Sequence, residues 1–283
     1  MRKLTKPEDA PLDVFNECIS RIRDVNLKNR LKACAHEIEL DSNEFDAKAN
    51  RTELHTIQSK NMVANSVNVE EMKKVYTGRM AKKLTPGRPY YDKLISLPAF
   101  GRCPLCCQRT VSTLDHYLPK QHFPSLTVTP FNLIPACQDC NKVKGENAPS
   151  RPEEETLHPY YDDVENFVWV KASLLEEEPI GVNFYVDTSA IQNELLANRL
   201  ENHFNIFKLN SLYSSHAAEE IASMERNFKN VFIDTGSDGL REFLAEIAES
   251  KMDLNPNSWQ SALYTCLARN VWFYECYFAK SDM

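Results

Sequence analysis

The sequence predicts a mainly helical α+β protein in which a small module with short strands lies between two helical regions. Apolar residues recur at helical spacing near the N-terminus, at Phe15, Ile19 and Ile22, and again in four longer stripes after Ser189. Near the middle of the chain, two Cys-x-x-Cys motifs enclose a segment with strand and loop character. These patterns predict helices at both ends and a compact module of a different kind between them.

Three regions follow from these patterns. Residues 1–100 are predicted to form an N-terminal helical region, whose end carries most of a basic segment at 73–102. Residues 101–165 are predicted to form the central module. Residues 166–283 are predicted to form a β-hairpin followed by an acidic helical region.

The C-terminal region divides into this hairpin and a set of helices. Apolar residues alternate with period two over 166–170 and 181–186, on either side of an acidic loop, which predicts two paired strands. Helical stripes follow, and the turn-forming segments Thr235-Gly236-Ser237 and Asn255-Pro256-Asn257 interrupt them. We assign no cofactor to these stripes, because an apolar stripe at helical spacing is typical of a packed bundle.

Composition excludes several classes of protein. Hydrophobic residues make up 42% of the chain and charged residues 26%, which is ordinary for a soluble globular protein. No apolar run is long enough to span a membrane, and no apolar stretch follows the first residues as in a secretory signal. Nine cysteines, four of them in metal-type pairs, favour a reducing cytoplasm over a disulfide framework. We therefore expect a cytoplasmic protein.

Charge is distributed unevenly along the chain. The net charge is −7, but residues 149–283 hold 10 Lys and Arg against 23 Asp and Glu, which leaves residues 1–148 at +6. A basic segment that leads into the central module is where a phosphate backbone would lie, although a solvated helix face explains such a segment equally well. The candidates for contacts with the DNA backbone are Lys73, Lys74, Arg79, Lys82, Lys83 and Arg88.

The two cysteine pairs predict a structural zinc site. They are Cys103 with Cys106 and Cys137 with Cys140, separated by 30 residues. Four thiolates at tetrahedral geometry suit Zn²⁺, and the long gap implies that the enclosed segment folds as part of the site. The alternative is two unrelated reduced pairs in a core, and Cys107 is expected to be a spare thiol.

The enclosed segment predicts the order strand, loop, strand, helix. Residues 111–116 are rich in β-forming residues, and residues 117–125 contain two prolines and are expected to form a loop. Strand character returns at 126–128, and a helix is expected to start at Cys137. Asp115 and His116 then lie at the end of the first strand, and the helix starts at the second cysteine pair.

The module resembles the HNH endonucleases, which have the ββα-metal fold. The motifs that carry the resemblance are Leu-Asp-His at 114–116, Asn-Leu-Ile-Pro-Ala-Cys at 132–137, and Cys-x-x-Cys-Asn-x-x-Lys-Gly at 137–145. They cover about 45 of the 283 residues. The family often has histidine at the last metal-binding position, and this chain has Asn141 there.

The resemblance implies a role for each matched residue. Asp115 and Asn141 would supply oxygen ligands to one catalytic ion, Mg²⁺ or Mn²⁺. His116 would act as the general base on a water molecule, because imidazole titrates near neutral pH. Asn132 would brace the loop that aims this histidine. Each of these residues alone would more often be structural, and it is their combination inside a four-cysteine module that points to a nuclease.

Three further residues are secondary candidates. Lys120 and Lys144 would hold phosphates near the metal, although exposed lysines are mostly solvated. His158 lies in a His-Pro sequence after the module and either approaches the metal or phosphate or caps local structure.

Taken together, these observations predict a metal-dependent endonuclease that hydrolyses DNA. The chain also resembles, more loosely, the effector subunits of Septu-type bacterial anti-phage systems, in which an ATPase controls the nuclease. No nucleotide-binding P-loop is present, so the ATPase would be a separate chain that docks on the C-terminal helical domain.

Two alternatives remain open. One is a zinc module that binds nucleic acid or protein without cutting, and the other is an HNH toxin directed at RNA. A single site of this type cuts one strand, so a double-strand break would require two events or two copies, for example in a homodimer.

Overall fold

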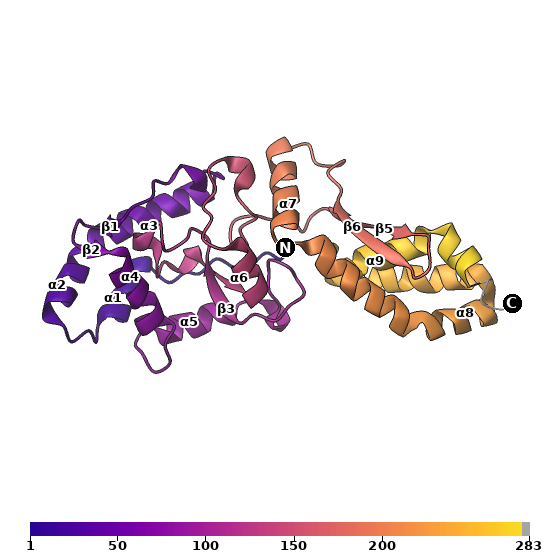
Figure 1. Ribbon diagram of the computed structural model, residues 1–283, viewed down its shortest axis with the longest axis horizontal. Coiled ribbons are helices and arrows are strands. Elements are labelled where there is room, and N and C mark those ends of the chain that lie inside the picture. The colour runs from indigo at the N-terminus through magenta and orange to yellow at the C-terminus, as the bar shows by residue number, and fades with distance from the viewer. Residues whose placement is uncertain (279–283) are drawn as a thin grey trace. The chain divides into compact units, whose positions relative to one another are not determined.

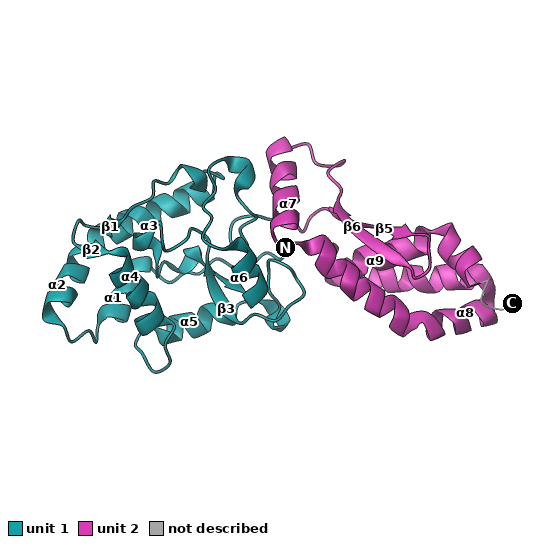
Figure 2. Cartoon of the chain, in the orientation of Figure 1, with its two compact units in different colours: residues 1–163 teal, residues 164–283 magenta. Residues whose placement is uncertain are grey.

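The computed structural model describes residues 1–278, and the chain divides into two compact units, residues 1–163 and residues 164–283 (Figure 2). The predicted α+β class is confirmed, because helices dominate and the strands of the described residues pair as three small antiparallel sheets. The first unit contains the predicted N-terminal helical region and all but the last two residues of the predicted module. The last five residues of the predicted C-terminal region lie outside the described residues.

The first unit contains six α-helices and two short antiparallel ladders (Figure 1). In chain order its main elements are α1 (Pro11–Ile19), α2 (Val25–Ala33), α3 (Ala35–Ala49), β1 (Met62–Val63), β2 (Val67–Asn68), α4 (Val69–Val75), α5 (Arg88–Ile95), β3 (Thr113–His116), β4 (Leu133–Ala136) and α6 (Gln138–Lys144).

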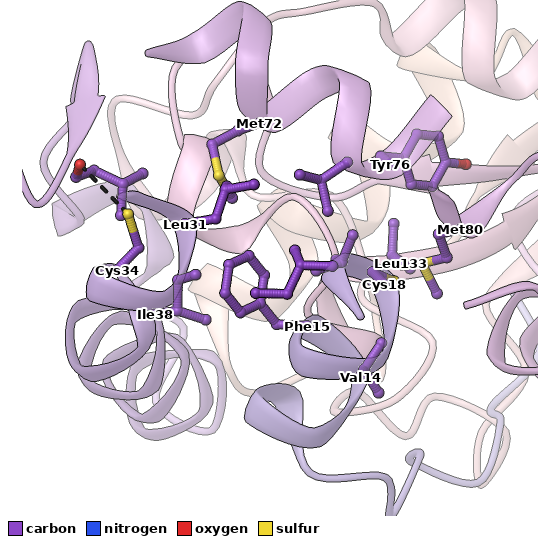
Figure 3. Packing of buried hydrophobic residues seen from close by; sticks show 14 of the residues in the cluster. Val14, Phe15, Cys18, Leu31, Cys34, Ile38, Met72, Tyr76, Met80 and Leu133 are labelled. Carbon is purple, nitrogen blue, oxygen red and sulfur yellow. Dashed lines mark hydrogen bonds between the residues drawn. The ribbon is translucent and has the colours of Figure 1, made fainter. Parts of the chain in front are cut away.

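One hydrophobic core joins the helices of the first unit to the module. Figure 3 shows Phe15 of α1 and Ile38 of α3 in this core together with Met72 of α4. Leu114 and Leu133, from the paired strands β3 and β4, belong to the same cluster and are at most 3% exposed. The helices therefore support the strands that carry the site residues.

Helix α4 is fixed at its start and changes geometry at its end. The side chains of Asn68 and Glu71 form a capping box, and Arg30 of α2 donates two hydrogen bonds to the Glu71 carboxylate, at 2.6 and 2.9 Å. After Val75 the helix continues as a π-helical turn, Tyr76–Met80. Such turns are uncommon and often accompany functional positions. Here the turn brings Tyr76 to the module.

The module has the predicted order of strand, loop, strand and helix, with one correction. β3 and β4 are antiparallel, with Asp115 opposite Ile134 and His116 opposite Leu133. The strand expected at 126–128 is absent. Residues Pro124–Leu126 form a 3₁₀ turn, and the Thr127 hydroxyl donates to the Pro124 carbonyl at 2.6 Å. Proline and a hydroxyl residue close a turn locally, and this outweighs the β propensity of a three-residue apolar run.

The second unit combines a β-hairpin with helices. Its elements are β5 (Val170–Leu175), β6 (Gly181–Val186), α7 (Glu194–Ile206), α8 (Leu209–Leu254), α9 (Trp259–Arg269) and a π-helical turn (Trp272–Tyr277). The helix α8 reverses direction at Gly236, whose φ is 72°, and the rings of Phe228 and Phe243 on its two arms lie 6.4 Å apart. The interruption predicted at this glycine is thus a hairpin between two helices.

The first hairpin strand begins later than predicted. The expected strand at 166–170 gives way to β5 at Val170–Leu175, whereas β6 matches the expectation. The backbone N–H groups of Trp169 and Val170 donate to Oδ1 of Asn257, at 2.8 and 3.3 Å, and the Trp169 indole donates to the Val164 carbonyl. The side chain of a residue nearly ninety positions away thus binds the backbone at the point where β5 begins.

Within the part of the chain that the structure describes, none of the helices combines the length and the apolar character needed to cross a lipid bilayer.

Candidate functional site

Four buried cysteine sulfurs gather at one point in the first unit. The Sγ atoms of Cys103, Cys106, Cys137 and Cys140 all lie within 4.8 Å of one another. Tetrahedral zinc with Zn–S bonds of about 2.3 Å needs sulfurs spaced by about 4 Å, so this cluster can hold one zinc ion. Cys137 is also the N-cap of α6, and its sulfur accepts a hydrogen bond from the backbone N–H of Cys140 at 3.4 Å.

The first cysteine pair lies in a tight backbone turn. The N–H of Cys107 donates to the Cys103 carbonyl, and the N–H of Cys103 donates to the Arg109 carbonyl, both at 2.8 Å. Cys107 adopts a left-handed conformation with φ of 57°, which closes the turn. Its own thiol is partly exposed, lies near the Pro104 carbonyl and is not part of the cluster, as expected for a spare thiol.

A pocket of about 260 Å³ opens beside the cysteine cluster. Strand β3 contributes Asp115 and His116, helix α6 contributes Asn141, and the loop after β3 contributes Lys120. The remaining lining residues are Tyr76, Thr113, Leu114, Pro119, Lys142, Gly145 and Glu146. The structure therefore brings three of the four predicted catalytic residues to one cavity, although they come from two separate motifs.

His116 is buried and is held as a neutral imidazole. Its ring nitrogen Nε2 lies 2.9 Å from the Thr127 carbonyl oxygen. A carbonyl only accepts, so Nε2 carries the hydrogen and Nδ1 keeps its lone pair. Burial, and then the charge of Lys120, lowers the pKa of His116 to about 3. A neutral ring with a free acceptor nitrogen is the form that a general base requires.

Asp115 presents a buried carboxylate oxygen that has no hydrogen bond. Its Oδ2 lies 3.2 Å from Nζ of Lys144, close enough for an ion pair but not aligned as a hydrogen bond. Burial raises the pKa of Asp115, and the Lys144 charge opposes that shift. A buried carboxylate oxygen without a hydrogen bond is costly unless a cation or donor faces it. With Asn141 on the same pocket, these oxygen donors fit a hard divalent ion.

Asn132 holds the loop between β3 and β4. It is fully buried, its Oδ1 accepts from the Leu118 N–H at 2.8 Å, and its Nδ2 donates to the carbonyls of Leu118 and Leu126 at 3.2 and 3.1 Å. This loop supplies the Thr127 carbonyl that His116 contacts. Asn132 therefore acts on the geometry of the pocket from outside it.

The two candidate lysines differ in position. Lys144 is buried, donates to the His116 carbonyl at 2.7 Å and pairs with Asp115. Lys120 lines the pocket with its ammonium 5.8 Å from the centre of the Tyr76 ring, and burial lowers the pKa of Lys120. Lys120 thus brings a cation to the pocket wall, whereas Lys144 already neutralises a carboxylate.

Tyr76 is a site residue that the sequence did not reveal. Its ring packs edge-on against His116, with ring centres 4.6 Å apart, and its hydroxyl donates to the Leu114 carbonyl at 3.2 Å. These contacts cross about forty residues of chain. A tyrosine inside a basic helical segment carries no local signal of such a role.

The structure places His158 away from the pocket. Its buried ring lies between those of Tyr117 and Tyr161, with centre distances of 4.4 and 4.7 Å, and its Nδ1 accepts from the Tyr160 N–H. The Asp162 carboxylate accepts from the His158 backbone N–H at 2.7 Å. His158 does not line the pocket, and its contacts are those of local capping and aromatic packing.

The basic segment is only partly available to a ligand. Lys73 pairs with Glu70, and Arg88 pairs with Asp92 and lies 4.4 Å from the centre of the Tyr91 ring. Four other side chains of the predicted set make no hydrogen bond or ion pair with a described residue. They are Lys74, Arg79, Lys82 and Lys83, of which all but Arg79 are exposed.

Comparison with known proteins gives one full-length and one partial similarity. The chain is 25% identical to protein ea31 of Escherichia phage lambda over 294 aligned positions, which cover 97% of this chain and 99% of that protein. It is 29% identical to the Septu protein PtuB of Bacillus thuringiensis over 87 positions, 29% of this chain and 33% of that protein. No family model matches the chain, and no solved structure matches it significantly.

Proposed function

We propose that this chain is a metal-dependent endonuclease of the HNH type that hydrolyses phosphodiester bonds in DNA. The observation that carries the proposal is the presence, at one pocket, of a neutral, oriented His116 and the buried Asp115 carboxylate, whose Oδ2 faces Lys144. A base and a hard oxygen ligand side by side are what water attack on a phosphodiester requires. The likeness of the module to HNH endonucleases supports the same assignment.

Each residue of the pocket has a chemical task in this proposal. Nδ1 of His116 takes a proton from the attacking water, and the Thr127 carbonyl accepts from Nε2–H and favours the imidazolium that results. Asp115 and Asn141 would hold Mg²⁺ or Mn²⁺, which stabilises negative charge on the phosphate and the leaving oxygen when bound. Lys120 faces the phosphate. The four cysteines would hold zinc that is purely structural.

The biological setting in this proposal is a defence system. The partial similarity to a Septu protein supports a role as an anti-phage effector, and protein ea31 of phage lambda is similar over nearly the whole chain. A separate ATPase chain would control the nuclease through the C-terminal unit. A homodimer would allow a double-strand break.

Plasmid nicking tests the proposal. We expect purified protein to nick supercoiled DNA with Mg²⁺ or Mn²⁺, and we expect His116→Ala to lower the rate by about 10²–10⁴-fold, the usual contribution of a general base. His122→Ala is the matched control, because this nearby histidine is exposed and should cut like wild type. Zinc content and melting temperature of all three proteins establish that the fold is intact.

Two outcomes would replace the proposal. Cutting of RNA but not of DNA would assign an RNA-directed nuclease. Binding of nucleic acid without cutting under either metal would assign a zinc module that does not catalyse.

A further inference from the structure

The loop between α4 and α5 places an apolar side chain almost entirely in water. Leu84 is 97% exposed, the highest value among the exposed large hydrophobic residues. Its backbone is left-handed, with φ of 61°. Figure 1 shows this segment as a loop on the outside of the first unit.

The base of this loop is held firmly. A Cβ atom at Gly87 would lie 2.4 Å from the Cys18 sulfur and 2.8 Å from the Arg79 carbonyl, so the backbone here is packed tightly against α1. The Arg88 guanidinium donates to the Ala81 carbonyl, which joins the two ends of the loop. The Thr85 hydroxyl donates to the Lys82 carbonyl at 2.7 Å. Leu84 is therefore held outward by an ordered turn.

The conformation of Leu84 brings no gain to the folded chain. A left-handed backbone is strained for a residue with a Cβ, and glycine or asparagine adopts it more easily. A leucine that remains in water gains nothing from burial. Strain and exposure at one ordered position are typical of residues that act on a partner outside the chain.

The charges around Leu84 indicate the kind of partner. Lys82 and Lys83 precede it, are exposed and make no ion pair with a described residue. The loop follows directly on the π-helical turn Tyr76–Met80, whose first residue lines the catalytic pocket. An apolar side chain directly after two exposed cations suits a polyanion with an apolar interior, and a nucleic acid duplex has this structure.

We propose that Leu84 is a wedge that inserts between adjacent base pairs of a duplex while Lys82 and Lys83 contact the flanking phosphates. Insertion unstacks one step and bends the duplex, as apolar wedges of other architectural proteins do. The loop would thereby anchor the duplex on the unit that carries the pocket. That the seated strand is then cut rests on the proposed nuclease function, but the insertion itself does not.

Insertion of Leu84 can be measured without cleavage when the His116→Ala variant serves as the background protein. A duplex that carries 2-aminopurine at successive positions reports unstacking as a rise in fluorescence. We expect this rise with Leu84 present and its loss in Leu84→Ser, with roughly tenfold weaker binding, since about one buried leucine is lost. Val25→Ser, at an exposed valine on α2, is the matched control and should behave like the background protein.

The two lysines are tested by a separate measurement, the salt dependence of binding. Lys82→Gln with Lys83→Gln should reduce the slope of log affinity against log salt by about two, whereas Leu84→Ser should leave the slope unchanged. DNA and RNA duplexes of one sequence, assayed in parallel, show which backbone the wedge accepts. Equal fluorescence and affinity for Leu84→Ser and the background protein on both duplexes would overturn the proposal.

Leu84→Gly provides a check on folding. It removes the side chain and relieves the left-handed backbone, so we expect a higher melting temperature together with weaker duplex binding. If Leu84→Gly lowers the melting temperature, the loop serves the fold and the wedge is refuted. If Leu84→Ser changes only the association of the chain with a protein, the loop serves a protein interface and the wedge is likewise refuted. Absence of nicking by wild type, with the fluorescence rise intact, would refute the nuclease and leave the wedge standing.

Discussion

The amide of Asn132 shows how a single residue shapes the pocket without lining it. Its oxygen accepts one hydrogen bond and its nitrogen donates two, all to backbone groups of the loop between β3 and β4. Only an asparagine of this size offers an acceptor and two donors in one plane at this place. Because the loop carries the Thr127 carbonyl, the orientation of His116 depends on this amide.

The substitution Asn132→Asp therefore tests the hydrogen bonds of this amide while it keeps the size and shape of the side chain. The substitution keeps the acceptor and the volume but removes both donors and turns a carboxylate oxygen toward two carbonyls. We expect a loss of about 2–4 kcal/mol in the free energy of unfolding, since two buried acceptors lose their partners. Urea unfolding followed by circular dichroism measures it. Asn61→Asp, at an exposed asparagine, is the control, and equal stability of the two variants would contradict this account.

At the scale of elements, the module is too small to fold by its own strands and helix. β3 and β4 have four residues each and α6 has seven. A lone two-stranded ladder and a helix of this length are both marginal in water. The cysteine cluster ties the turn before β3 to the first turn of α6, and the hydrophobic core supports the strands from the other side. We infer that metal binding supplies much of the stability of the module.

Cys137→Ser tests this inference. The variant should lose its zinc, because only three thiolate ligands remain, and the module should unfold with it. Metal content per chain and the melting temperature are the two measurements. Cys107→Ser, at the neighbouring spare thiol, should keep both at wild-type values. A Cys137→Ser protein with full zinc and unchanged melting would show that the cluster is not a zinc site.

At the scale of the molecule, site and charge are divided between the two units. Every residue assigned to the candidate site lies in residues 1–163. Residues 164–283 hold 9 Lys and Arg against 18 Asp and Glu, so the second unit has a net charge of −9. Because the net charge of the whole chain is −7, the first unit has a net charge of +2. The second unit therefore repels nucleic acid at low ionic strength, which suits a docking or restraining role.

A chain that ends at Asp163 should keep the site and lose the restraint. We expect it to bind one zinc, to retain metal-dependent nicking and to bind DNA more tightly than the full chain at low salt, with the difference vanishing as salt screens the charge. Zinc content and salt-dependent DNA binding are measured side by side for both chains. Unchanged affinity at low salt would remove the restraining role, and loss of zinc would show that the units depend on each other for folding.

Local sequence patterns predicted those parts of the structure that depend on residues close together in the chain. The cysteine cluster, the helical stripes and the breaks at Gly236 and after α8 follow from spacing, because ligand geometry and helical periodicity repeat over a few residues. The order strand, loop, strand, helix was predicted for the same reason, but the second strand was placed at 126–128 and lies at Leu133–Ala136. The catalytic roles of Asp115, His116 and Asn141 stay predictions, although one pocket brings these residues together.

Long-range packing accounts for most of what the sequence did not predict. Tyr76 meets His116 across forty residues, the Asn257 side chain binds the backbone of Trp169, and aromatic rings enclose His158 away from the pocket. The exposure of Leu84 follows from how its loop is anchored at Gly87 and Arg88. Such contacts depend on which surfaces of the chain meet after folding, and neither propensity nor motif spacing contains that information.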